Sequence, residues 1–177
     1  MHCEQESQLV STGSIGGTLK SASPTDKLRW LGLSLALLLV DQAAKYAAST
    51  YLDYGERRAV TEFFSWTHLH NTGAAFSFLA DAGGWQRAFL IGVAVVISAF
   101  LLRWLWRGVT SQGQGIALSA ILGGALGNLT DRLLRGYVVD FLDFHFAQYH
   151  WPAFNLADVW ITTGAASLMW AHARYRE

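Results

Sequence analysis

Long apolar stretches separated by polar segments dominate the pattern of residues along the chain. They cover residues 30–51, 87–106, 115–134 and 155–172. A helix needs about 20 predominantly apolar residues to cross the hydrocarbon core of a bilayer. The pattern therefore predicts an all-α membrane protein in which a bundle of four transmembrane helices carries the fold.

The polar segments between these stretches differ in character. Residues 1–26 are rich in Ser, Thr and Gly without periodicity, which predicts a disordered tail before a membrane-embedded domain of residues 27–177. Between the first two apolar stretches, residues 61–69 read TEFFSWTHL, and the turn signal NTG follows. This pattern predicts a small extracytoplasmic β element on the membrane surface. Residues 143–152 are expected to form a short aromatic segment at the interface.

Composition supports a membrane protein and excludes several other classes. Hydrophobic residues make up 52% of the chain and charged residues 15%, whereas about 25% of a soluble domain is charged. The net charge is zero, and no basic tract predicts a nucleic-acid partner. The single cysteine, Cys3, excludes an intramolecular disulfide. His68 and His70 have no evident third ligand, so we expect them on alternate strand faces and not in a metal site.

Ionisable residues in or beside the apolar stretches are the candidates for function, because charge near a bilayer is costly. Asp41 and Lys45 are four residues apart on one helix face, which predicts a buried ion pair. The wall of a functional site is the alternative for this pair. Four further aspartates fall close to or inside the last two apolar stretches: Asp131, Asp140, Asp143 and Asp158.

Asp140 and Asp158 can meet at the outer membrane boundary if the segment between them folds back. Two close carboxylates share a proton over a useful pH range. One can take a proton from water while the other donates to a carbonyl oxygen, which hydrolyses a peptide without a metal. Spacing alone also allows helix caps or salt-bridge partners, and that alternative stays open. Asp143 is expected to be an interfacial acid outside the site.

Short motifs follow one another in a definite order along the chain. They are DQAAK (41–45), HNTGAAFS (70–77), GGALGNLTDR (123–132), GYVVDF (136–141) and FNLAD (154–158). In this series the chain resembles lipoprotein signal peptidase, also called signal peptidase II, a bacterial intramembrane aspartyl peptidase. The resemblance covers about residues 28–172.

The resemblance implies an aspartic endopeptidase that removes signal peptides from prolipoproteins carrying diacylglycerol, cutting before the lipidated cysteine. It implies that Asp140 and Asp158 form the catalytic dyad. Residues implied to bind substrate and orient the dyad are Asn71, Asn128, Arg132 and Asn155. Residues expected to be structural are Asp41, Lys45 and Asp131. The resemblance implies no cofactor or metal, and the cyclic peptide antibiotic globomycin is the expected inhibitor.

The distribution of basic residues predicts the orientation in the membrane. Lys and Arg are slightly more numerous on the side that carries both termini, which predicts cytoplasmic termini. With the resemblance, the expected location is the bacterial inner membrane, with the active site at its outer face. Nothing in the sequence requires more than a monomer surrounded by membrane lipid.

Two other classes of protein also fit the aspartates. A small proton-coupled transporter would use Asp41, Lys45, Asp140 and Asp158 as a relay, although the chain lacks the inverted repeat of many transporters. A non-enzymatic four-span interaction protein would use the aspartates as helix caps. Loss of precursor cleavage on Asp→Asn substitution would distinguish the peptidase from both.

Overall fold

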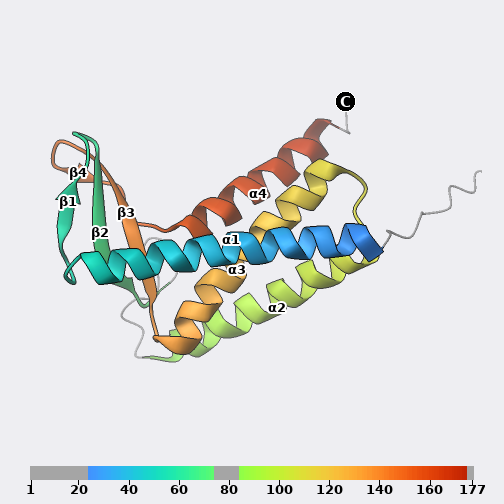
Figure 1. The fold of residues 1–177 in the computed structure, drawn as a ribbon, viewed down its shortest axis with the longest axis horizontal. Helices are drawn as coiled ribbons and strands as arrows, with labels where there is room; N and C mark the ends of the chain where they lie inside the picture. Colours follow the sequence, from blue (N-terminus) through green and yellow to red (C-terminus); the bar gives the residue numbers. More distant parts are fainter. Residues whose placement is uncertain (1–23, 74–83, 175–177) are drawn as a thin grey trace, which may run out of the picture.

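The computed structural model describes residues 24–73 and 84–174. A small sheet lies at one end of a group of helices (Figure 1). In chain order the elements are α1 (Pro24–Tyr51), β1 (Arg57–Ala59), β2 (Phe64–Asn71), α2 (Trp85–Arg107), α3 (Gln112–Leu134), β3 (Val138–Phe146), β4 (Tyr149–His150) and α4 (Leu156–Arg174).

Each predicted apolar stretch forms a helix, with ends close to those expected. The largest difference is at α1, which begins at Pro24, so residues 24–26 are helical and not part of a tail. Proline is favoured at the first position of a helix, and the carboxylate of Asp26 in the first turn suits the helix dipole. The rest of the predicted tail, residues 1–23 with Cys3, lies outside the described residues.

Helix α3 packs against each of the other helices, and small residues allow its close approach to α1. A Cβ atom on Gly123 would lie 2.7 Å from the backbone oxygen of Ser34, and one on Gly127 would lie 2.6 Å from Asp41 Oδ2. Both distances are too short for a real contact, so α1 and α3 can meet at this separation only where α3 carries glycine.

Both ends of α3 carry a residue that suits a helix terminus: a serine caps its N-terminus, and a glycine follows its C-terminus. Ser111 Oγ accepts a hydrogen bond from Gln114 N at 3.2 Å, as is common at the start of a helix. Gly136 follows the last turn with φ 87°, a left-handed conformation that glycine adopts without a steric penalty. The chain therefore reverses after α3 and enters β3 directly.

The sheet is larger than the sequence predicted, and its second half corrects the all-α expectation. Its strands are antiparallel in the order β1-β2-β3-β4. Strand β4 and the end of β3 fall within residues 143–152, which were expected to be a short interfacial stretch, whereas β3 itself begins at Val138. Phe64 pairs with Phe144 and Asn71 pairs with Val138, and the partners are far apart in sequence. A local pattern cannot reveal such a pairing, because the partner strand lies beyond two intervening helices.

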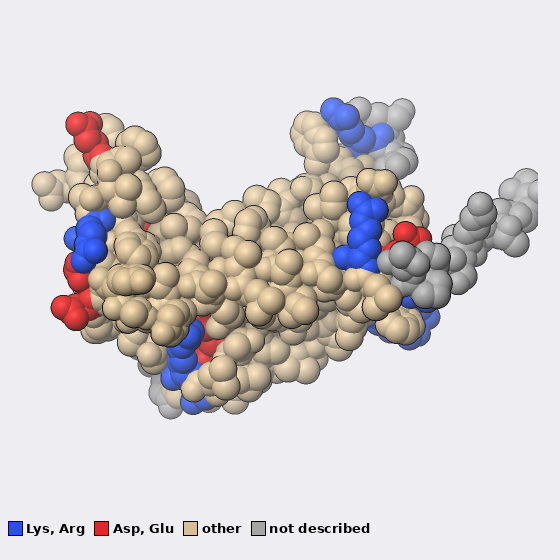
Figure 2. All heavy atoms as spheres, viewed as in Figure 1, with Lys and Arg blue, Asp and Glu red and all other residues tan. Residues whose placement is uncertain are grey.

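Membrane crossing is supported for part of the helical group. Among the described helices, α1 over Asp26–Tyr51 and α2 over Trp85–Arg107 are long and apolar enough to span a bilayer. Charged residues on the drawn face gather near the two ends of the molecule, and a broad uncharged belt separates them (Figure 2). The structure confirms four helices at the predicted positions, while the crossing by α3 and α4 stays a prediction.

Candidate active site

Two carboxylates at the sheet end of the molecule share one asparagine. Asp140 lies on β3, Asp158 lies in the first turn of α4, and Asn155 immediately precedes that helix. Asn155 Nδ2 donates to Asp140 Oδ1 at 2.6 Å. Asn155 Oδ1 accepts from Asp158 N at 3.1 Å, and Asn155 N donates to Asp158 Oδ2 at 3.3 Å. One residue therefore connects the two carboxylates.

The two remaining carboxylate oxygens are held by other asparagine amides. Asn71 Nδ2, at the end of β2, donates to Asp140 Oδ2 at 3.0 Å. Asn128 Nδ2, near the end of α3, donates to Asp158 Oδ1 at 2.9 Å. Each of the four carboxylate oxygens thus accepts one N–H bond. Both side chains are therefore held in a defined orientation.

The environment of Asp140 favours a protonated carboxyl near neutral pH. Burial and the neighbouring charge of Asp158 raise the pKa of Asp140 to about 7, although hydrogen bonds from Asn71 and Asn155 and the charge of Lys45 oppose the rise. Two interacting carboxylates titrate as a pair. The Asp140 carboxyl therefore carries a proton at pH values below about 7.

Arg132 supplies hydrogen-bond donors beside the aspartates. Its guanidinium donates to Gly73 O at 2.8 Å and to Asn128 O at 3.3 Å. Within the part of the chain that the structure describes, Arg132 Nε is buried and has no hydrogen-bond partner. A planar guanidinium with an unused N–H is suited to bind a carbonyl oxygen.

A fully buried ion cluster lies beneath the asparagines and aspartates. Lys45 Nζ is 2.9 Å from Asp41 Oδ2 and 2.9 Å from Asp131 Oδ2. It also donates to Asn128 Oδ1 at 2.9 Å. Lys45, Asp41 and Asp131 are each 0% exposed, and the three donors of the ammonium group are all used. The expected ion pair between Asp41 and Lys45 is thus present, and it extends to α3.

The structure brings all nine sequence-predicted residues into one connected group, whereas Asp143 lies apart. Asp143 was expected to be an interfacial acid, but its side chain is only 1% exposed. It accepts from His150 Nδ1 at 3.0 Å and is 3.4 Å from Arg57 Nε. Since these partners lie on β4 and β1, Asp143 joins strands of the sheet and has no direct link to the carboxylate pair.

The expectation that His68 and His70 lie on alternate strand faces was wrong. Their Nε2 atoms are 3.2 Å apart, because side chains two residues apart on a strand point to the same face. His70 also stacks on Tyr137 with ring centroids 3.6 Å apart. Among the described residues, no group of three or more His, Cys, Asp or Glu side chains is placed to hold a metal ion.

The sequence analysis did not predict two polar residues that contact Asp131. Gln42 Nε2 donates to Asp131 Oδ1 at 3.2 Å and to Gly127 O at 3.1 Å. Arg135 forms an ion pair with Asp131. The spacing of four residues between Asp131 and Arg135 was a signal for that pair. Gln42 carried no such signal for these contacts, because Gly127 and Asp131 lie on another helix.

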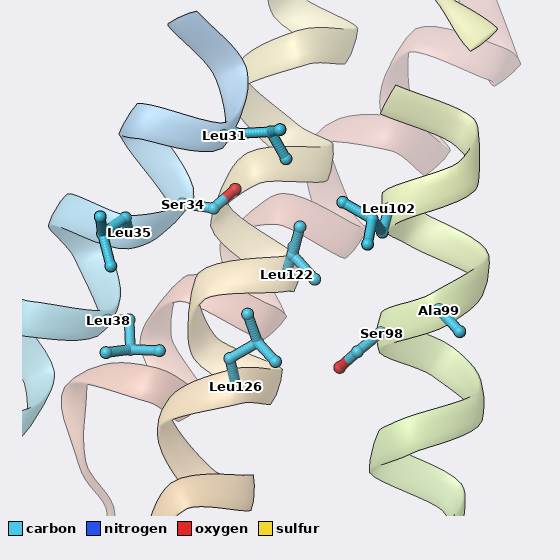
Figure 3. Close-up of a pocket in the computed structure, with 9 residues that line it drawn as sticks. All are labelled: Leu31, Ser34, Leu35, Leu38, Ser98, Ala99, Leu102, Leu122 and Leu126. Carbon is cyan, nitrogen blue, oxygen red and sulfur yellow. The ribbon is translucent and has the colours of Figure 1, made fainter. Parts of the chain in front are cut away.

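An apolar pocket is separate from this polar group. It has a volume of about 210 Å³ and lies between α1, α2 and α3 (Figure 3). Its lining residues are Leu31, Ser34, Leu35, Leu38, Ser98, Ala99, Leu102, Leu122 and Leu126. None of these side chains is a titratable group, so the pocket supplies no acid or base.

Solved structures with the same arrangement define the class of protein. One, described as a bacterial membrane enzyme determined by the in meso method at 2.3 Å resolution, matches with a TM-score of 0.74 and 28% identity. The match covers 82% of this chain and 88% of that one. A second, described in the same words at 1.9 Å resolution, matches with a TM-score of 0.70, 29% identity and coverage of 81% and 91%. The fold is that of a bacterial membrane enzyme.

Sequence comparison narrows the class to one family. Residues 33–174 match the family described as Signal peptidase (SPase) II. A lipoprotein signal peptidase from Cupriavidus taiwanensis is 50% identical over 150 residues, which are 85% of each chain. One from Serratia marcescens is 54% identical over 135 residues, which are 76% of this chain and 79% of the relative. The chain belongs to the signal peptidase II family, whose members are proteases of lipoprotein processing.

Proposed function

We propose that this chain cleaves diacylglyceryl-modified prolipoproteins before the lipidated cysteine, with Asp140 and Asp158 as its catalytic pair. The observation that carries the proposal is the bridge through Asn155, which hydrogen-bonds to both carboxylates. The raised pKa of Asp140 supports it, because burial and the Asp158 charge keep a proton on Asp140 up to about neutral pH.

The pair performs hydrolysis without a covalent intermediate. The ionised carboxylate takes a proton from a water molecule, whose oxygen attacks the scissile carbonyl carbon. The protonated carboxyl donates its proton to the carbonyl oxygen as the tetrahedral intermediate forms. On collapse, a hydroxyl group of this intermediate gives its proton to the ionised carboxylate as the carbonyl forms again. The C–N bond breaks, and the leaving amine takes a proton from the protonated carboxyl. The proton count of the pair is restored at the end of the cycle.

The neighbouring polar groups bind the substrate backbone. Arg132 donates to a substrate carbonyl, with Nε as the free donor. Asn71 and Asn128 hold the outer oxygens of the two carboxylates, so that the inner geometry is set before binding. A cyclic peptide of the globomycin type occupies the same position and inhibits cleavage.

The membrane arrangement explains how a lipid-modified substrate reaches this site. All four helices cross the inner membrane, with both termini in the cytoplasm and the sheet at the outer face. Basic residues at the helix ends away from the sheet support this orientation, including Arg29 on α1 and Arg107 on α2. The acyl chains of the substrate stay in the bilayer while the bond to be cut lies at the polar end. The enzyme acts as a monomer.

Substitution of each aspartate tests the catalytic assignment. We expect Asp140→Asn and Asp158→Asn each to lower cleavage of a lipid-modified precursor by about 10⁴-fold or more, because hydrolysis requires both members of the pair. Asp143→Asn is the matched control, since it makes the same change on β3 outside the site, and it should retain cleavage. Wild-type cleavage should fall as the pH rises through about 7, when Asp140 loses its proton.

Retained cleavage in either site variant would exclude the catalytic pair. Folding is checked independently by monodispersity and thermal unfolding in detergent. A folded but inactive variant locates the defect in the chemistry.

A further inference from the structure

The buried ion cluster holds the backbone immediately before each catalytic aspartate. Asp41 Oδ1, on α1, accepts a hydrogen bond from Ala157 N at 2.8 Å, and Ala157 precedes Asp158. Asp131 Oδ2, on α3, accepts one from Val139 N at 3.2 Å, and Val139 precedes Asp140. Two carboxylates outside the reaction therefore fix the backbone next to the two carboxylates that carry it out.

Lys45 connects these two attachments. Its ammonium group lies 2.9 Å from both Asp41 Oδ2 and Asp131 Oδ2. Each carboxylate thus accepts one hydrogen bond from the backbone of the site and also contacts Lys45. A shift of the ammonium group would move both attachments together, because both carboxylates share it as their central partner.

The third donor of Lys45 reaches Asp158 through a side chain. Lys45 Nζ donates to Asn128 Oδ1 at 2.9 Å. An ammonium group can only donate, so the oxygen of the Asn128 amide must face Lys45 and its nitrogen must face Asp158. The amide then donates to Asp158 Oδ1 at 2.9 Å. Lys45 therefore determines which way the amide points.

We propose that Lys45 is a positioning residue for the catalytic pair, setting the spacing of Asp140 and Asp158 and the orientation of the Asn128 amide. This inference rests on the proposed function of the two aspartates. Lys45 touches neither substrate nor reacting atoms. It acts through three hydrogen-bonded paths, by Asp41, by Asp131 and by Asn128.

If Lys45 served only to neutralise the buried carboxylates, it would need fewer contacts than it makes. Neutralisation of Asp41 and Asp131 requires only their two contacts with the ammonium group, and Arg135 already pairs with Asp131. The contact with Asn128 adds nothing to charge balance, because an amide is neutral. That contact is explained by control of the amide, and its loss should appear in the chemical step.

The charges around the pair give the positioning role a second readout. Asp140 is faced by Asp158 from α4 and by Lys45 from α1, and Arg132 lies near both aspartates. Burial and Asp158 raise the pKa of Asp140, and the positive charge of Lys45 opposes that rise. Removal of the Lys45 charge therefore raises the pKa further and should move the pH profile of cleavage to higher pH.

The decisive variant is Lys45→Met, measured by cleavage of a lipid-modified precursor in detergent micelles. Rates are expressed per mole of monomeric folded protein. We expect kcat to fall by about 100-fold, because small misplacements of catalytic groups have effects of this size. KM should change by less than about threefold, because the substrate contacts remain. The pH profile should move to higher pH.

Ser34→Ala is the matched control, since Ser34 is a buried polar residue on α1 outside the site. This variant should keep the wild-type kcat and pH profile.

A double variant keeps the test valid if Lys45→Met fails to fold. In Asp41→Asn/Lys45→Met, the asparagine can still accept from Ala157 N, and Asp131 keeps Arg135. We expect this protein to fold and still to show the lowered kcat and the displaced profile, because the Asn128 amide has lost its partner. A wild-type kcat and profile in the double variant would overturn the proposal. So would activity that falls only in proportion to the amount of folded protein, with the profile of the remainder unchanged.

The same cleavage assay tests separately whether Asp140 and Asp158 are the catalytic residues. Cleavage by Asp140→Asn or Asp158→Asn would defeat the proposed function. Inactivity of both, together with full activity of the Lys45 variants, would defeat only the positioning role.

Discussion

Asn155 Nδ2 donates to Asp140 Oδ1 at 2.6 Å, and this bond joins the start of α4 to strand β3. The same asparagine caps the first turn of α4, where its Oδ1 accepts from Asp158 N at 3.1 Å. Asn155 thus both caps helix α4 and hydrogen-bonds to the carboxylate of Asp140. Any change that moves the start of α4 will therefore move both carboxylates relative to each other.

Burial of Asp140 makes the stability of the protein depend on pH. Its pKa is about 7 in the folded protein and 3.8 in the reference state, so the folded state binds the proton more tightly. The stabilisation is fully present below about pH 4 and is lost as the pH rises through about 7, with an upper limit of roughly 4 kcal/mol. We expect thermal unfolding in detergent to occur at progressively lower temperature from pH 5 to pH 8.

Asp140→Asn removes the titrating group and should flatten this part of the curve. The quantity to compare is the difference in Tm between wild type and variant at each pH, which cancels the titration of other groups. Parallel curves for the two proteins would contradict the assignment of the raised pKa to Asp140.

A methyl group at Gly127 should disturb the buried ion cluster. A Cβ atom there would lie 2.6 Å from Asp41 Oδ2, and Asp41 is fixed by Lys45 and by Ala157 N. We expect Gly127→Ala to destabilise the protein by about 1–3 kcal/mol, the usual cost of overpacking, and to lower the cleavage rate. Thermal unfolding and cleavage are measured on the same preparation.

Gly92→Ala is the matched control for that substitution. Gly92 lies on α2, and a Cβ atom there would meet nothing within 4 Å. Its stability and activity should stay close to wild type. Equal behaviour of the two alanine variants would show that Gly127 does not limit the approach of α1 and α3.

The role of Asp143 in the sheet predicts a loss of stability without a loss of chemistry. Asp143→Asn weakens the contacts with His150 on β4 and Arg57 on β1. We expect a cost of about 1–2 kcal/mol, because Arg57 and His150 are both partly exposed and the bonds are partly replaced by water. The measurement is Tm together with the cleavage rate of the folded protein. A strong fall in cleavage with an unchanged Tm would place Asp143 in the reaction instead.

Some contacts of the site were predictable from local spacing, whereas the choice of site residues came from the resemblance of the ordered motifs to signal peptidase II. Asp41 with Lys45, and Asn155 with Asp158, lie within one helical turn, so their proximity follows from the period of the helix. Two predictions differed from the structure: the relative positions of His68 and His70, and the extent of the sheet. For the histidines, the strand period was applied wrongly. The end of β3 and β4 were interpreted as an aromatic interfacial segment, because the strand that pairs with β3, β2, is distant in sequence.

Runs of apolar residues leave few alternatives in a membrane protein, so they were sufficient to place the helices along the chain. The ordered motifs, through their resemblance to a family, indicated the polar residues of the candidate site. The sequence could not determine which hydrogen bonds those residues make. Asn128 faces both Lys45 and Asp158, and Asp41 reaches Ala157 N across 116 residues of chain. Such contacts depend on the packing of α1, α3 and α4 and on the pairing of β2 with β3. Only the tertiary structure brings these elements together, because the energies that select their arrangement come from groups distant in sequence.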